Sequence, residues 1–147
     1  LIATQQSLSS TQIIFFLEDP SPRVQALACV ATWQTSLRDP QVRAAYEQTW
    51  AAFQEAPPEM ANRIRRTIVR AIQRTGDRQL MPLLQQVLQG ANAEVKREGL
   101  QTLARLATSS DHLLSTLAAR ELLHADPTVR AAAINLLQVL PREDALA

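Results

Sequence analysis

The sequence predicts an all-α protein, built as a right-handed α-solenoid (α-α superhelix) of about four antiparallel helix pairs. The composition is rich in alanine, leucine, glutamine and arginine, with three glycines in 147 residues and 4% aromatic side chains, which favours helix over strand. Eight prolines cut the chain into short pieces whose apolar residues recur with helical spacing. One type of helix start recurs along the chain, which is typical of stacked repeats.

These breaks predict eight helices. Their expected ranges are 11–18, 22–37, 40–54, 58–75, 78–89, 93–107, 110–124 and 127–140. Two of the helices start at an Asp-Pro pair, Asp39-Pro40 and Asp126-Pro127. Such a pair supplies a capping carboxylate and a proline whose fixed φ suits the first helical position.

The three glycines have different expected roles. Gly76 and Gly90 follow predicted helices and suit the left-handed residue with which many helices end. Asp77 and Asn92 follow them and can cap the next helices. Gly99 instead lies inside the 93–107 helix, where glycine costs about 1 kcal/mol relative to alanine. We therefore expect Gly99 to allow the close approach of another helix.

Two neighbouring helices differ in the arrangement of their apolar residues. Helix 40–54 has a single apolar stripe and is expected in an outer layer. The stripe consists of Val42, Tyr46, Thr49, Trp50 and Phe53. Helix 22–37 is apolar on two sides, with a thin polar seam at Gln25, Thr32 and Ser36, and is expected between neighbours. Trp33 and Trp50, which could stack on nucleic-acid bases, lie on apolar faces and are expected in the core. Which of the two helices is the inner member of its pair stays open.

Charge and cysteine content exclude several classes of protein. Fifteen basic and fourteen acidic residues leave a formal charge of +1, too balanced for wholesale attraction to nucleic acid or an anionic membrane. Cys29 is the only cysteine, which excludes an internal disulfide or a cysteine-based zinc site, and its apolar neighbours predict a buried thiol. No stretch approaches the roughly 18 apolar residues of a membrane span. We expect no membrane contact by this segment and a cytoplasmic location, or a cytoplasmic-facing position in a larger protein.

We expect residues 1–147 to be a single repeat domain and a fragment of a longer protein. The chain starts at Leu1 rather than at methionine. The last predicted helix carries Ile134, Leu137 and Val139 beside its main apolar face, whereas a terminal repeat should present a polar side to water. Another repeat or another subunit is therefore expected to cover it, with residues 141–146 beginning the next helix.

The recurring helix start indicates the length of the repeat. It occurs as DPQVRAA at 39–45, NAEVKR at 92–97 and DPTVRAAA at 126–133, with a degenerate copy, MANRIR, at 60–65. Ile64 and Val95 are 31 residues apart, and Val95 and Val129 are 34 apart, a period that corresponds to one helix pair. These segments resemble HEAT repeats, most closely the short bacterial variety first associated with phycobilin lyases. The resemblance covers essentially the whole chain and is clearest from 76 to 140.

This resemblance implies a structural ladder between repeats. In the family, the residue after the valine is usually an arginine that ties one repeat to the next through an acidic residue of a turn. By position, the ladder would consist of Arg43, Arg65, Lys96 and Arg130, with Asp39 and Asp126 as acceptors. The resemblance also implies an alternative function, that of a lyase-like chaperone for a tetrapyrrole.

No catalytic, metal or cofactor site is expected. The sequence has no Gly-rich phosphate loop, nucleophile elbow or metalloprotease motif. His112 and His124 are the two histidines, and they lie about 18 Å apart along one predicted helix. They cannot share a metal ion from that helix, so a capping or solvent-facing role is expected. We therefore expect that the protein is not an enzyme.

The candidate partner-binding feature is a cationic stripe on helix 58–75, formed by Arg63, Arg66, Arg70 and Arg74. Like charges at this spacing cost about 0.2–0.5 kcal/mol per pair in an isolated helix. Three offsets are open: solvent with acidic residues of adjacent helices, an acidic protein or another domain of the parent chain, and a nucleic-acid backbone. We expect a non-catalytic scaffold or regulatory module that binds an acidic partner on its inner-helix surface, with nucleic-acid binding as the runner-up.

Overall fold

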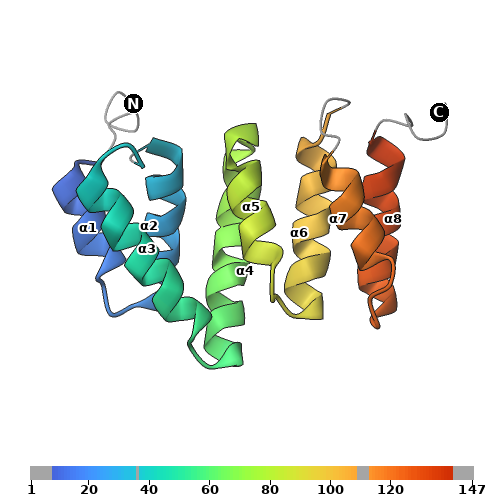
Figure 1. The fold of residues 1–147 in the computed structure, drawn as a ribbon, viewed down its shortest axis with the longest axis horizontal. Helices are drawn as coiled ribbons and strands as arrows, with labels where there is room; N and C mark the ends of the chain where they lie inside the picture. The colour runs from blue at the N-terminus through green and yellow to red at the C-terminus, as the bar shows by residue number, and fades with distance from the viewer. Residues whose placement is uncertain (1–7, 36, 109–112, 141–147) are drawn as a thin grey trace. The chain divides into compact units, whose positions relative to one another are not determined.

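The computed structural model of the chain describes residues 8–35, 37–108 and 113–140, which form helices and turns without a strand. Eight α-helices lie in these residues (Figure 1). They are α1 (Ser10–Leu17), α2 (Pro22–Thr35), α3 (Pro40–Gln54), α4 (Pro58–Thr75), α5 (Met81–Leu88), α6 (Ala93–Leu106), α7 (Leu113–Glu121) and α8 (Pro127–Val139). The predicted all-α class is confirmed.

One predicted helix begins differently from the expectation. The range 78–89 starts as a short 3-10 helix, η2 (Arg78–Leu80), and continues as α5. Pro82 has no N–H to donate to the Arg78 carbonyl four residues back, and the Met81 N–H bonds to that carbonyl instead. Residues 110–112 of another predicted helix lie outside the described residues, as does the segment 141–146 that was expected to begin a further helix.

The chain divides into two compact units, Leu1–Ala71 and Ile72–Ala147, and the division falls inside α4. In the first unit, α1, α2 and α3 all pack against one another. The largest fully buried side chains of this unit include Ile13, Leu17, Val42 and Ile68. The Thr49 hydroxyl donates a hydrogen bond to the Leu17 carbonyl at 3.3 Å and ties α3 to α1.

In the second unit, α6 packs against both α5 and α8, and α7 packs against α8 (Figure 1). Leucine is the commonest residue in the core of this unit, and its fully buried members are Leu80, Leu83, Leu84, Leu100, Leu103, Leu114 and Leu136. A polar contact also joins the end of α4 to α6, because the Gln73 side-chain amide donates to the buried Thr102 hydroxyl at 2.8 Å.

The glycine predictions are confirmed. Gly76 and Gly90 have φ values of 61° and 74°, the left-handed conformation that ends helices at low cost for glycine. Gly99 is buried in α6. A Cβ added at Gly99 would overlap the Leu88 side chain, lying only 3.0 Å from its Cγ. Gly99 therefore allows α5 to approach α6 closely.

The predicted faces of α2 and α3 are partly right. Val42, Tyr46 and Phe53 of α3 are buried, in agreement with its apolar stripe. The polar seam of α2 was wrong at Thr32, which is fully buried. Its hydroxyl donates to the Ala28 carbonyl at 2.7 Å, so the polar group is satisfied inside its own helix and can enter the core.

Candidate functional site

The arginine stripe lies along α4. The side chains of Arg63, Arg70 and Arg74 are exposed, and that of Arg66 is half-buried. The opposite side of the helix is buried, and its members are Ala61, Ile64, Ile68, Val69 and Ile72. Helical spacing thus separates a cationic face from an apolar face on one helix.

The four arginines differ in their local interactions. Arg66 and Arg70 each interact with other groups of the chain. The Arg63 and Arg74 guanidinium groups make no hydrogen bond or ion pair with the described residues. Arg74 lies in the last turn of α4, where a cation interacts favourably with the helix dipole. The Arg63 guanidinium is therefore exposed to solvent without a partner among the described residues.

The predicted ladder residues use different acceptors from those expected. Arg43 Nε donates to the Leu37 carbonyl at 3.0 Å. Arg130 Nη1 donates to the carbonyls of His124 and Ala125 at 2.8 and 2.9 Å. Both side chains thus bind the backbone of the turn that precedes their own helix, where carbonyl oxygens need donors.

The two aspartates assigned to the ladder are helix caps. Asp39 accepts from the Gln41 N–H at 2.9 Å, and Asp126 accepts from the Thr128 N–H at 2.8 Å. These bonds stabilise the carboxylate form. Hydrogen bonds from Ser10 and Gln41 lower the pKa of Asp39, and hydrogen bonds from the Thr128 side chain and backbone lower the pKa of Asp126.

Lys96 joins two helices of the second unit. Its Nζ lies 3.2 and 3.3 Å from the two carboxylate oxygens of Glu121, so α6 is tied to α7. The exposed fractions of the two side chains are 20% and 13%. This ion pair is therefore partly shielded from water, and salt should screen it less than a fully exposed pair.

Arg65, the remaining ladder residue, is nearly buried, with 6% of its surface exposed. Its Nη1 makes a long contact of 3.5 Å with the Asn62 side-chain oxygen, and its Nε has no hydrogen-bond partner among the described residues. Burial lowers the pKa of the guanidinium. No carboxylate of the described residues forms a salt bridge with it, so the expected acidic acceptor is not found there.

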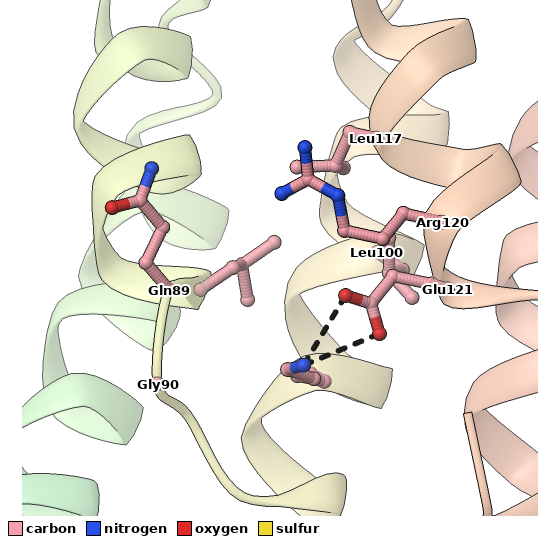
Figure 2. Close-up of a pocket in the computed structure, with 8 residues that line it drawn as sticks. Gln89, Gly90, Leu100, Leu117, Arg120 and Glu121 are labelled. Atoms are coloured by element: carbon pink, nitrogen blue, oxygen red, sulfur yellow. Dashed lines mark hydrogen bonds and ion pairs between the residues drawn. The ribbon is translucent and has the colours of Figure 1, made fainter. Parts of the chain in front are cut away.

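A cavity of about 190 Å³ opens between the end of α5, α6 and α7 (Figure 2). Its apolar lining is Leu88, Leu100 and Leu117, and its polar lining is Gln89, Lys96, Arg120 and Glu121, with Gly90 at the turn. Lys96 and Leu100 are one turn apart on α6, and Leu117 and Glu121 are one turn apart on α7. In each helix, two side chains on one face thus contribute to the lining of the same cavity.

The charges around this cavity are not all paired. Glu121 is neutralised by Lys96. Arg120 is exposed and makes no hydrogen bond or ion pair with the described residues. Figure 2 shows its side chain extending across the cavity toward Gln89, away from the ion pair. The rim therefore carries a positive charge, that of Arg120, which no described residue neutralises, beside an apolar wall.

Sequence reasoning missed this cavity. Leu117, Arg120 and Glu121 were placed only within a predicted helix, and Lys96 was assigned to the ladder. A usable signal is the spacing of a basic residue and a leucine on α6 and of a leucine and an acidic residue on α7. That signal becomes informative only once the two helices are known to be adjacent.

The other chemically notable residues have structural roles. Cys29 is buried, and burial raises the pKa of its thiol to about 12, so little nucleophilic thiolate exists near neutral pH. His124 Nδ1 accepts from the Asp126 N–H at 3.0 Å, in agreement with the predicted capping role, whereas His112 lies outside the described residues. Within the described ranges, no group of three histidine, cysteine, aspartate or glutamate side chains is arranged to hold a metal ion.

The two tryptophans are half-buried in an aromatic cluster of the first unit. Tyr46 lies between them, with ring centroids 6.1 Å from Trp33 and 5.8 Å from Trp50, and Trp50 meets Phe53 edge-on at 4.6 Å. These distances are typical of stabilising aromatic pairs. The tryptophans thus pack against other aromatic side chains, but they are half-buried rather than in the core, where the sequence predicts them.

Among the described helices, none combines the length and apolarity needed to cross a bilayer. Comparison of the chain with protein-family models, with curated protein sequences and with solved structures gave no match.

Proposed function

We propose that this chain is a non-catalytic protein-interaction module that binds an acidic segment of a partner along the arginine stripe of α4. The observation that carries the proposal is the exposure of Arg63, Arg70 and Arg74 on one helical face. The partner is a second protein or another domain of a parent chain. The module acts as a scaffold or as a regulatory surface.

Spacing supports an extended contact rather than a single ion pair. Arg63 and Arg70 are seven residues apart, which corresponds to about 10 Å along a helix. A guanidinium group binds a carboxylate through two parallel N–H bonds, which are stronger than bonds between neutral groups. Partner carboxylates at this spacing would lower the electrostatic repulsion among the arginines. This favourable free energy arises only when the partner is bound.

We also propose that the helices form a HEAT-like repeat stack and that the arginine stripe belongs to its partner-binding surface. Support comes from two equivalent helix starts in the second unit. Asn92 and Asp126 cap α6 and α8 with their side chains. Val95 and Val129, three residues later, are both fully buried. Structural repeats are expected to have the same capping and buried residues at corresponding positions, as α6 and α8 do.

The test uses a fluorescent oligo-glutamate peptide as the probe and compares two double variants. Arg63→Glu with Arg70→Glu reverses two charges of the stripe. Arg23→Glu with Arg38→Glu is the matched control, because these arginines are also exposed in the first unit and lie outside α4. Fluorescence anisotropy should show binding by the native chain and the control, and a loss of about tenfold or more in the stripe variant.

Equal weakening in both double variants would contradict the proposal, because the binding would then follow net charge alone. A mixed-sequence DNA duplex serves as the second probe. If the duplex binds more tightly than the peptide, with steep salt dependence and a loss specific to the stripe variant, the nucleic-acid alternative replaces the proposed function. Circular dichroism of each variant verifies that the helices are retained.

A further inference from the structure

A second surface, formed entirely within the Ile72–Ala147 unit, carries an inference beyond the proposed function. We propose that the cavity between α5, α6 and α7 is an anchor site for a partner peptide with one leucine- or phenylalanine-sized side chain beside a carboxylate. The proposal rests on the juxtaposition of an apolar wall with the Arg120 guanidinium at its rim, which has no partner among the described residues. None of the stripe arginines lines this cavity, so the two proposals can fail separately.

The size of the cavity selects a single side chain. Cavities that enclose whole small molecules are typically about 300–1,000 Å³, which is larger than the 190 Å³ found here. A cavity of about 150 Å³ lined by apolar groups accepts a benzene molecule. The volume therefore fits one leucine or phenylalanine side chain, and it is too small to enclose a tetrapyrrole.

The apolar wall is formed before any ligand binds. Leu100 is fully buried and Leu88 is 5% exposed, and the two helices that carry them are in close contact at Gly99. Leu117 of α7 is half-buried, so it is the leucine that a ligand would contact most, with Leu88 and Leu100 behind it. A preformed apolar surface favours binding, because little conformational freedom is lost when a ligand enters.

A glycine lies at the edge of the cavity. Gly90 lines it and has no side chain of its own. Its φ of 74° belongs to the left-handed region, which other residues adopt only with strain. The local backbone thus favours glycine at this position, so no side chain projects from it into the cavity.

The charge at the rim specifies a carboxylate. Lys96 and Glu121 satisfy each other through two contacts of 3.2 and 3.3 Å. Arg120 remains as the positive group without a partner among the described residues. A carboxylate next to the anchoring side chain would form a charge-assisted hydrogen bond with this guanidinium. An uncharged segment would gain only the apolar contact.

Three blocked dipeptides test the two parts of the proposed ligand. Acetyl-Leu-Asp-amide carries both the anchor and the carboxylate. Acetyl-Leu-Asn-amide removes the charge at nearly constant shape, and acetyl-Ala-Asp-amide removes the anchor. Methyl NMR spectra of the labelled chain report binding at the leucines of the cavity. Dissociation constants on the order of 1 mM are expected, because so small a ligand has few atoms to bind with.

The expected order is clear from the contacts. Acetyl-Leu-Asp-amide should shift the methyl signals of Leu88, Leu100 and Leu117 in a saturable way. Acetyl-Leu-Asn-amide should bind about threefold to tenfold more weakly, since an exposed charge contact makes a modest contribution. Acetyl-Ala-Asp-amide should cause no saturable shift at these leucines.

Two arginine variants locate the charge contact. Arg120→Gln should remove the preference for acetyl-Leu-Asp-amide over acetyl-Leu-Asn-amide while keeping the apolar contact. Arg105→Gln is the matched control, because Arg105 is exposed on α6 and does not line the cavity; it should leave the preference unchanged. Both residues are exposed, so neither change should unfold the chain.

Three outcomes would overturn the proposal. In the first, the aspartate and asparagine peptides bind the native chain equally well. In the second, the alanine peptide shifts the leucine signals as strongly as the leucine peptide. In the third, Arg105→Gln and Arg120→Gln reduce the preference equally, which would indicate a general charge effect. The oligo-glutamate experiment on α4 involves none of these residues, so its result is independent.

Discussion

Gly99 of α6 lies so close to Leu88 of α5 that an added Cβ would overlap the Leu88 Cδ2 atom unless the Leu88 side chain moved. This contact brings the two helices together beneath the cavity, whose wall includes Leu88 and Leu100. The glycine that is unfavourable for the isolated helix is therefore favourable for the packed pair.

Gly99→Ala should destabilise the chain by about 1–3 kcal/mol because the buried contact becomes overpacked. Helix propensity alone predicts the opposite sign, a gain of about 1 kcal/mol. Urea unfolding followed by circular dichroism measures the difference. Combining Gly99→Ala with Leu88→Ala should cost less than the sum of the two single changes, because the smaller side chain makes room. A stabilised Gly99→Ala variant would show that the Leu88 side chain moves aside at little cost.

The ion pair between Lys96 and Glu121 should couple the two residues by about 0.5–1 kcal/mol, because it is only partly shielded from water. A double-mutant cycle with Lys96→Gln and Glu121→Gln measures this coupling by urea unfolding. The coupling should shrink at high salt. A coupling of zero at low salt would contradict the assigned contact.

Thr102→Val should destabilise the chain by about 1–2 kcal/mol, because the Gln73 amide loses its acceptor at a part-buried position. Thr67→Val is the matched control. The Thr67 hydroxyl donates only to the Arg63 carbonyl of its own helix, so this change should stay within about 0.5 kcal/mol. Similar losses for both variants would mean that the contact between α4 and α6 contributes little to stability.

Asp126 should make stability depend on pH in the acidic range. Its pKa is lowered in the folded chain by hydrogen bonds from Thr128, so its carboxylate is bound more favourably in the folded than in the unfolded state. The contribution is present above the unfolded pKa of about 3.9 and is lost as the pH falls through the folded pKa.

Asp126→Asn should therefore lose less stability than the native chain between about pH 5 and pH 3, since asparagine also caps helices but does not titrate. Urea midpoints measured over this range test the expectation. Asp39→Asn should show the same effect, because Asp39 also accepts a backbone N–H, from Gln41, and its pKa is also lowered. Equal pH dependence in the native and Asp126→Asn chains would refute the assignment.

Local chemistry made the helix positions predictable. Asp126 and Pro127 act within one turn of chain, and Gly76 and Gly90 act at single residues, so these signals need no partner elsewhere in the sequence. The stripe on α4 was predictable for the same reason, because helical geometry alone places residues three and four apart on one face. The close packing at Gly99 was predictable because glycine is unfavourable inside a helix, but the sequence did not identify Leu88 as the residue it contacts.

Other features were missed although the groups involved lie close together in the sequence. Arg130 was expected to bind a carboxylate, but the carbonyls of His124 and Ala125 are its acceptors. Thr32 was expected in a polar seam, but its hydroxyl bonds within its own helix and the residue is buried. In both cases a backbone carbonyl competes with the predicted environment, and a residue pattern contains no information about that competition.

By itself, the sequence determined the helical class, the caps and the charged face of α4, because each arises from interactions within a few residues. Tertiary structure alone decided the burial of Arg65, the ion pair between Lys96 and Glu121 and the cavity beside Arg120. The ion pair and the cavity need side chains from separate helices, and the burial of Arg65 needs other parts of the chain to cover it. Their free energies depend on desolvation and distance, which are defined only once the chain has folded.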